Sequence, residues 1–80
     1  MTFRVLLIGA GGVFGSRLAE QLATSGLCEL VLSGRSEANA AALLQRGIGT
    51  RFAAFDRAKP DEAQLRALGV DLMIDAAGPF

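Results

Sequence analysis

The sequence contains no histidine, tyrosine or tryptophan, a single cysteine (Cys28) and a single lysine (Lys59). One cysteine cannot form an internal disulfide, which excludes a small secreted scaffold held together by disulfides. The absence of histidine argues against a zinc site of the usual His/Cys kind, and we assign no metal ligand. Any histidine base or tyrosine acid that the chemistry needs must therefore come from outside these 80 residues.

The charges balance, because eight Lys and Arg face eight Asp and Glu. A net charge of zero gives no electrostatic basis for binding nucleic acid or an anionic membrane. Hydrophobic residues make up 51% of the chain, which is too many for a disordered protein. The first apolar run is stopped at Gly9, too early for a signal peptide, and no run reaches the roughly 18 residues of a membrane span. We expect a globular, cytoplasmic domain with neither a nucleic-acid nor a membrane partner.

Short apolar segments alternate with helix-like segments along the chain. Arg4–Ile8 is apolar without alternation, which is typical of a strand buried on both faces of a parallel sheet. In the first helix we expect Phe14, Leu18 and Leu22 to form the buried stripe, and Pro60 should begin the last helix. Strands are predicted at 4–8, 28–33, 51–55 and 70–75, and helices at 13–24, 37–46 and 60–68. This β-α-β-α-β-α-β order predicts an α/β protein with a doubly wound parallel sheet, a partial Rossmann fold in strand order 3-2-1-4.

A glycine-rich segment, Gly9–Gly15, follows the first strand directly and reads Gly-Ala-Gly-Gly-Val-Phe-Gly. The simple G-x-G-x-x-G pattern fails because its last position holds phenylalanine. Gly9, Gly12 and Gly15 fit G-x-x-G-x-x-G instead, and Gly11 is an additional glycine. The first glycine allows a sharp turn, the second a close approach to a pyrophosphate, and the third close packing of the helix on the strand.

The start of the first helix would complete such a site. The N–H groups of Val13 and Phe14 would face the phosphates, and the helix dipole adds partial positive charge there. The glycine spacing between a buried strand and an amphipathic helix therefore predicts a dinucleotide-binding loop. A tight turn that binds nothing is the alternative.

The end of the second strand indicates which dinucleotide is bound. A site that prefers NAD usually has an acidic residue there, but this chain has Gly34-Arg35-Ser36. The planar guanidinium of Arg35 could pair with a 2′-phosphate, and Ser36 could donate to it, so we predict NADP over NAD. Two alternatives stay open: Arg35 is a solvated loop residue, or Glu37 swings to the ribose and favours NAD.

Two carboxylates end the later strands. Asp56, after the third strand, could accept from the adenine amino group, or it could only cap the following turn. Asp75 ends the fourth strand, where a structural role is the simpler interpretation. The small residues Ala77 and Gly78 follow, and they would let the backbone lie against the second ribose and the nicotinamide.

With these residues in view, nearly the whole chain resembles the N-terminal NAD(P)-binding domain of the saccharopine dehydrogenase family. The matching segments are 5–15, 32–36 and 71–80, and the Asp-Ala-Ala-Gly-Pro-Phe ending of the last is the most specific. Members of this family are two-domain oxidoreductases or reductase-like proteins. The resemblance implies that the pyrophosphate is held by Gly9, Gly12 and Gly15, the adenosine ribose side by Gly34, Arg35 and Ser36, and the nicotinamide end by Ala77, Gly78 and Pro79.

The leading hypothesis is the cofactor-binding part of an NADP-dependent oxidoreductase. We interpret residues 1–80 as the N-terminal part of a dinucleotide-binding domain whose substrate domain is absent, and we expect this chain alone to be inactive. The alternatives are a non-catalytic dinucleotide sensor, part of an extended short-chain reductase or epimerase, and a purely structural domain. The fourth strand would be an exposed edge, so association of copies into a homo-oligomer is also expected. The predicted cofactor-binding residues, with no catalytic residue assigned, are Gly9, Gly11, Gly12, Val13, Phe14, Gly15, Gly34, Arg35, Ser36, Asp56, Ala77 and Gly78.

Overall fold

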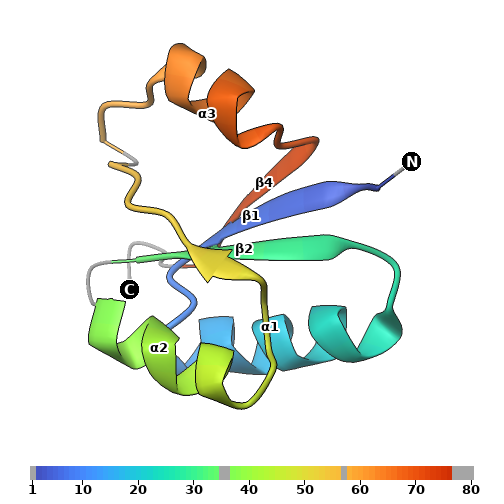
Figure 1. The fold of residues 1–80 in the computed structure, drawn as a ribbon. Helices are drawn as coiled ribbons and strands as arrows, with labels where there is room; N and C mark the ends of the chain where they lie inside the picture. Colours follow the sequence, from blue (N-terminus) through green and yellow to red (C-terminus); the bar gives the residue numbers. More distant parts are fainter. Residues whose placement is uncertain (1, 35–36, 57, 77–80) are drawn as a thin grey trace.

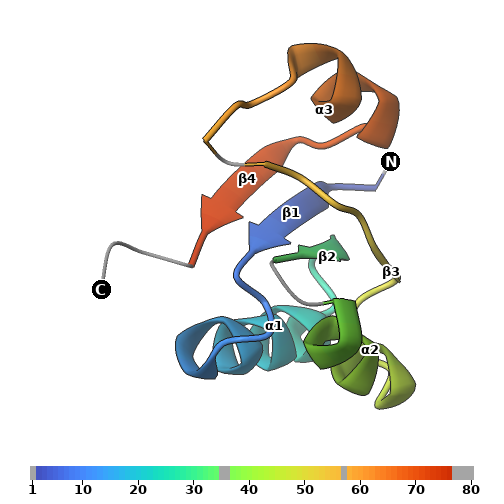
Figure 2. The ribbon, with the colours of Figure 1, turned by 90° about the vertical axis from the view of Figure 1, so that its left-hand side faces the viewer.

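The fold is a parallel sheet with helices on both faces, seen in a computed structural model that describes residues 2–34, 37–56 and 58–76 (Figures 1 and 2). Within these residues the strand order is β3-β2-β1-β4, and every strand pairing is parallel. The elements are β1 (Arg4–Ile8), α1 (Val13–Ser25), β2 (Glu29–Ser33), α2 (Glu37–Gln45), β3 (Arg51–Phe52), α3 (Glu62–Leu68) and β4 (Leu72–Asp75). The predicted fold class, element order and strand order are confirmed.

Three of the strands end at the same level. The last residue of β1, Ile8, lies opposite Ser33 on β2 and Asp75 on β4. The segments that leave these strands therefore start from the same edge of the sheet, the one formed by the carboxyl ends of the strands, which lies on the left in Figure 1. Parallel sheets of this kind bind ligands at that edge, where the carboxyl ends of the strands lie.

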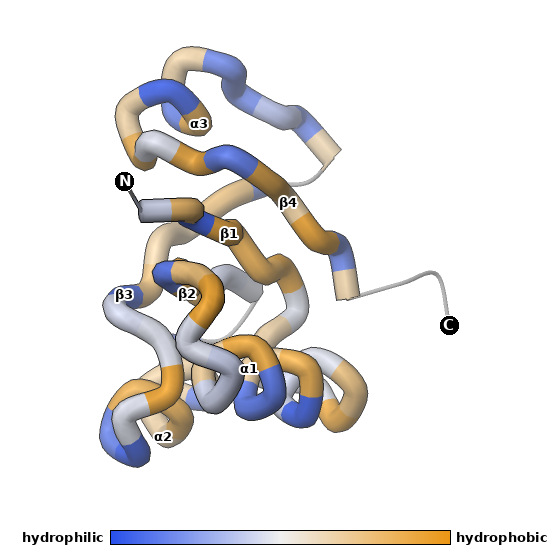
Figure 3. The backbone as a smooth tube through the Cα atoms, turned by 90° about the vertical axis from the view of Figure 1, so that its right-hand side faces the viewer, coloured by the Kyte–Doolittle hydropathy of each residue, from blue (hydrophilic) through white to orange (hydrophobic). Residues whose placement is uncertain are grey.

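The core has two parts, one on each face of the sheet. Alternate residues of β1 point to opposite faces, because successive side chains of a strand do so. Leu7 belongs to the core under α1 and α2, whereas Leu6 and Ile8 belong to the core under α3. Figure 3 shows the apolar stretches concentrated in the strands, with hydrophilic residues spread over the outer parts of the helices. The apolar run of β1 is therefore buried on both faces, as its lack of alternation predicts.

The buried face of α1 differs from the prediction. Gly15 and Ala19 are buried, Leu18 and Leu22 are partly buried, and Phe14 is 63% exposed. The prediction that Phe14 packs in the core is wrong. The side chain lies in the first turn of the helix, where the chain has just left the end of β1, so the sheet does not cover it.

The third strand and third helix are shorter than predicted. The prediction extended the strand to Phe55, but β3 ends at Phe52, although the N–H of Ala53 still donates to the carbonyl of Leu32 at 2.9 Å. Phe55 instead turns inward and is buried in the core under α3. The last helix begins at Glu62 and not at Pro60, because the side chain of Asp61 caps it.

Replacing Asp61 with alanine should destabilise the fold by about 1 kcal/mol, the usual cost of losing an N-cap side chain. The Oδ1 atom of Asp61 accepts from the N–H of Ala63 at 2.9 Å and of Gln64 at 3.3 Å, and both donors lose this acceptor in Asp61→Ala. Urea denaturation followed by circular dichroism would measure the change. Glu62→Ala is the matched control, since it removes an exposed ion pair with Arg66 and a negative charge near the helix start, which together should cost less than the cap. Equal stability of the two variants would contradict the prediction.

The edge strand β4 is poorly covered. Leu72 is 47% exposed on the face that carries α1 and α2, and Met73 is 43% exposed on the opposite face. The described residues thus leave apolar side chains uncovered on both faces of β4, as well as its unpaired edge. No helix among them is long and apolar enough to cross a membrane.

Candidate functional site

The glycine loop between β1 and α1 is attached to the end of β2. The N–H groups of Gly9 and Ala10 both donate to the carbonyl of Ser33, at 2.9 and 3.1 Å. Gly9 has a φ of +83°, a left-handed conformation that favours glycine. The N–H of Gly12 then donates to the carbonyl of Gly9 at 3.1 Å, which closes the turn. The loop is therefore held in place by backbone hydrogen bonds.

The third glycine of the pattern lies directly against the first. A Cβ atom on Gly15 would be 1.9 Å from the carbonyl oxygen of Gly9 and 2.7 Å from its carbonyl carbon. No side chain fits there, so α1 can start this close to the end of β1 only with glycine at this position. The close packing expected from the spacing is thus present.

The start of α1 has free hydrogen-bond donors. Gly12 is the N-cap residue, with extended backbone (φ −80°, ψ 173°), and no side chain in the described part of the chain caps the helix. The first N–H groups of a helix have no acceptor within the helix, and the first turn of α1 contains no acidic residue that could serve instead. Val13 and Phe14 are exposed here, at 81% and 63%. An anion can therefore approach these N–H groups from solvent, with the helix dipole in its favour.

Gly11 contacts α2, which no sequence pattern predicts. A Cβ atom on Gly11 would be 2.7 Å from the Cβ of Asn39, so the loop passes closely over this helix. Gly34, which follows β2, also adjoins the loop, because a Cβ atom there would make an ordinary contact of 3.7 Å with the Cα of Gly9. The structure therefore brings the glycine loop and the end of β2 together.

Ser33 is a further residue at this place that the sequence did not single out. Its carbonyl holds the loop, and its side chain is fully buried, with an Oγ atom that has no hydrogen-bond partner among the described residues. The one sequence feature that could have indicated Ser33 is a serine at the end of a strand of leucine and valine.

The carboxylate of Asp56 accepts a hydrogen bond from a residue in its own turn. Its Oδ1 accepts from the N–H of Ala58 at 2.9 Å, and its carbonyl accepts from the N–H of Lys59 at 3.1 Å. This is the turn-capping role that the sequence left open as the alternative. The residue is exposed, and its contact with adenine stays a prediction.

The segment after β4 begins beside the glycine loop. Asp75 lies opposite Ile8, and the N–H of Ala76 donates to the carbonyl of Ile8 at 2.9 Å. The predicted nicotinamide-side residues, Ala77 and Gly78, lie outside the described residues, as do Arg35 and Ser36 on the ribose side.

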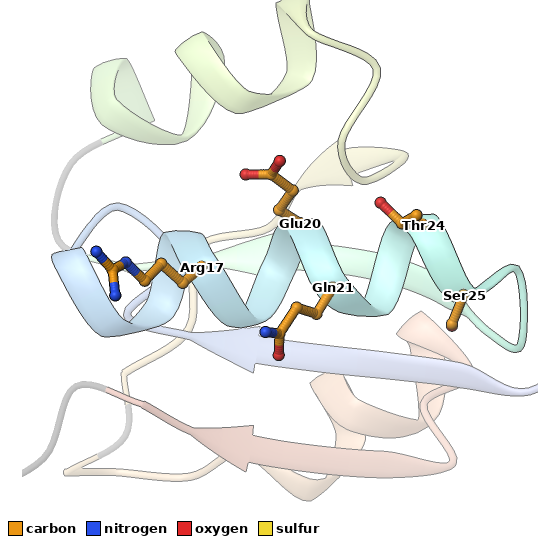
Figure 4. Close-up of a pocket in the computed structure, with 5 residues that line it drawn as sticks. All are labelled: Arg17, Glu20, Gln21, Thr24 and Ser25. Atoms are coloured by element: carbon orange, nitrogen blue, oxygen red, sulfur yellow. The ribbon is translucent and has the colours of Figure 1, made fainter.

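A shallow hollow runs along the outer face of α1 (Figure 4) and is lined by Arg17, Glu20, Gln21, Thr24 and Ser25. Glu20 forms an ion pair with Arg46 at 3.4 Å. All of the lining residues belong to one helix, so the hollow is a feature of its surface and not a cleft between elements. Within the described residues, no group of three or more potential ligands could hold a metal ion.

Comparison with known proteins identifies a family and two similar solved structures. A family model described as the saccharopine dehydrogenase NADP binding domain matches residues 5–80. One similar solved structure comes from work on engineering a reductase to attenuate substrate inhibition in asymmetric catalysis, with a TM-score of 0.73 and 24% identity. Another is a structure of SsCR, with a TM-score of 0.70 and 26% identity. Both alignments cover 100% of this chain and 25% of the other, so the chain spans about a quarter of their length. No curated protein matches it.

Proposed function

The chain belongs to the family of saccharopine dehydrogenase NADP-binding domains, and from this premise we propose that it positions NADP for hydride transfer in an oxidoreductase. The family confirms the cofactor that the sequence predicts. The observation that carries the proposal is the uncapped start of α1, which lies behind a loop that hydrogen bonds to β2 hold in place. When bound, NADP supplies the hydride chemistry, and this chain supplies binding and orientation.

The described residues suit the phosphates of a dinucleotide. The N–H groups of Val13 and Phe14 point out of the helix start, and none of the described side chains accepts from them. Gly12 and Gly11 are exposed and have no side chains, so a diphosphate can come close to the backbone. We therefore place the diphosphate over 11–14, with its charge facing the positive end of the helix dipole.

The adenosine end would lie toward the end of β2. Gly34 leaves β2 beside Gly9, and Arg35 and Ser36 follow it in the chain. This order supports the proposal that the guanidinium of Arg35 pairs with the 2′-phosphate, which NAD lacks. The other half of the cofactor would extend toward the end of β4, where Ala76 hydrogen-bonds to β1.

Thermal-shift and calorimetric titrations of the chain should show tighter binding of NADP than of NAD. Arg35→Ala should weaken NADP binding about tenfold, since a charge-assisted contact is lost, and should leave NAD binding unchanged. Arg51→Ala is a control of equal charge, because Arg51 is exposed on the edge strand β3, two strands away from β1 and the glycine loop. The proposal fails if neither dinucleotide binds. The NADP preference fails if NAD binds more tightly or if Arg35→Ala leaves NADP affinity intact.

We further propose that substrate is held by other parts of a longer protein. Three features support this: the chain spans a quarter of the similar solved structures, the outer edge of β4 is unpaired among the described residues, and these residues leave Leu72 and Met73 exposed on its two faces. A further strand and helix packed there would cover these side chains. Asp71, which precedes β4, and Asp75, the last residue of β4, would oppose each other in an antiparallel pairing of two copies centred on Met73. Such like-charge pairs destabilise a sheet, so this pairing of copies is disfavoured.

A further inference from the structure

We propose that Arg17 provides the side-chain cation for the diphosphate of the bound cofactor and so adds charge to a loop that otherwise offers only backbone donors. The inference rests on the proposed function, because it requires a dinucleotide at the start of α1. It goes further by assigning a binding role to a helix residue outside the glycine pattern.

The position of Arg17 allows this contact. It lies four residues after Val13, one turn along the helix and about 6 Å along its axis. Side chains on a helix lean toward its N-terminus, and an extended arginine spans such a distance. Figure 4 shows the Arg17 side chain lying along the outside of α1 with its guanidinium directed toward the first turn. The guanidinium therefore lies beside the surface over which we place the diphosphate.

The residues between Gly9 and Arg17 provide no other charge. The loop and the first turn are glycine, alanine, valine and phenylalanine up to Ser16, whose hydroxyl donates to the carbonyl of Val13 at 3.1 Å. The first turn contains no acidic residue either. Arg17 is thus the first charged side chain after β1, and it is the one cation on α1.

The cation of Arg17 is also without an anion. It is exposed and forms no ion pair with any residue in the described part of the chain, whereas the nearby Glu20 is paired with Arg46. A positive charge directed toward the positive end of a helix dipole is unfavourable by itself. A diphosphate at the helix start makes this arrangement favourable, because the guanidinium and the positive end of the dipole then attract the same anion.

Other described cations are placed differently. Arg4 pairs with Glu29 at 2.9 Å, and Arg66 pairs with Glu62 at 3.1 Å. Arg51 begins β3 opposite Val31 of β2, and Val31 belongs to the core under α3, on the face of the sheet away from α1. Arg51 is therefore a suitable control for the loss of one exposed positive charge.

The test compares Arg17→Gln, Arg17→Lys and Arg51→Gln by calorimetric titration with NADP, NAD, ADP-ribose and adenosine 2′-phosphate. The first three ligands contain the diphosphate, and the last has only the 2′-phosphate. We expect Arg17→Gln to weaken binding of NADP, NAD and ADP-ribose by the same factor, about fivefold at low salt, and to leave adenosine 2′-phosphate unaffected. Arg17→Lys should recover most of the affinity, and Arg51→Gln should bind as the wild type does.

Stability provides an independent readout. The ligand-free Arg17→Gln chain should melt at the same temperature as the wild type or slightly higher, because an unfavourable charge near the helix start is removed. Unchanged ADP-ribose affinity in a folded Arg17→Gln variant would overturn the inference while leaving the proposed function intact. A lower melting temperature, or equal loss for adenosine 2′-phosphate, would also overturn it. If the wild-type chain binds none of the four ligands, the proposed function fails as well.

Discussion

Gly15→Ala is expected to lower the free energy of unfolding by about 3 kcal/mol, the upper end of the usual cost of overpacking. The added Cβ would be 1.9 Å from the carbonyl oxygen of Gly9, which is a backbone atom and not the flexible end of a side chain. Gly9 cannot easily withdraw, since its N–H is bonded to the carbonyl of Ser33 and its carbonyl accepts from Gly12. Relief therefore requires α1 to move away from the sheet, at the expense of the packing around Ala19.

Chemical denaturation followed by far-ultraviolet circular dichroism would measure this effect. Gly12→Ala is the matched control, because the same methyl group at Gly12 would make only an ordinary contact of 3.5 Å, with the carbonyl oxygen of Gly9. The φ of Gly12 is −80°, which any residue adopts. A Gly15→Ala variant as stable as Gly12→Ala would show that the start of α1 can shift freely, contrary to the structure.

Gly12→Ala, unlike Gly15→Ala, should leave the chain folded but weaken its binding of NADP about tenfold or more. Gly12 is exposed at the N-cap, where the N–H groups of the first turn face solvent. A methyl group there stands between those donors and the diphosphate, and the charge-assisted hydrogen bonds that are lost account for a change of this size.

Calorimetric titration with NADP would test it, with Ser16→Ala as the control. That substitution removes one exposed hydroxyl that bonds to the carbonyl of Val13 in the same turn, and it leaves the loop backbone unchanged. Wild-type NADP affinity in Gly12→Ala would mean that the phosphates do not approach the backbone here. Together the two glycine variants separate a residue needed for packing from a residue needed for the ligand.

Much of the architecture could be predicted from local patterns. The run of apolar residues in β1 indicates burial on both faces, and this agrees with the two cores around Leu7 and Leu6. Gly26 and Gly69 end α1 and α3 in left-handed conformation, with φ of +69° and +70°. These features depend on residues close together in the chain, which is why the sequence reveals them.

The structure differs from the sequence predictions where a packing contact or a cap overrides the local pattern. Phe14 has the spacing of a core residue, but the contact between Gly15 and Gly9 sets which face of α1 meets the sheet. Phe55 continues an apolar strand in the sequence, yet it packs beneath α3 because an apolar space exists there between sheet and helix. Pro60 is a good first helical residue, but the side chain of Asp61 can reach two N–H groups and becomes the cap.

In the candidate site, too, local patterns predict some features and miss others. The spacing of Gly9, Gly12 and Gly15 after a buried strand indicated a phosphate-binding loop, and the family that matches the chain is one of NADP-binding domains. The sequence did not show that the carbonyl of Ser33 holds the loop or that Gly11 passes over Asn39. Those contacts join residues that are far apart in the chain, so no local pattern encodes them.

By itself the sequence determined the order of elements, the parallel sheet and the position of the glycine loop, because each follows from short-range hydrophobic periodicity and from the backbone freedom of glycine. It also indicated the cofactor, because an arginine and no acidic residue follows the second strand. The tertiary structure alone decided which face of α1 is buried, where β3 ends and how the amino ends of β1, β2 and β4 are held together. There Arg4 donates to the carbonyl of Leu68 at 2.6 Å and to Glu29 at 2.9 Å. The physical reason is that packing and long-range hydrogen bonds depend on which surfaces meet, and that is settled only when the whole chain folds.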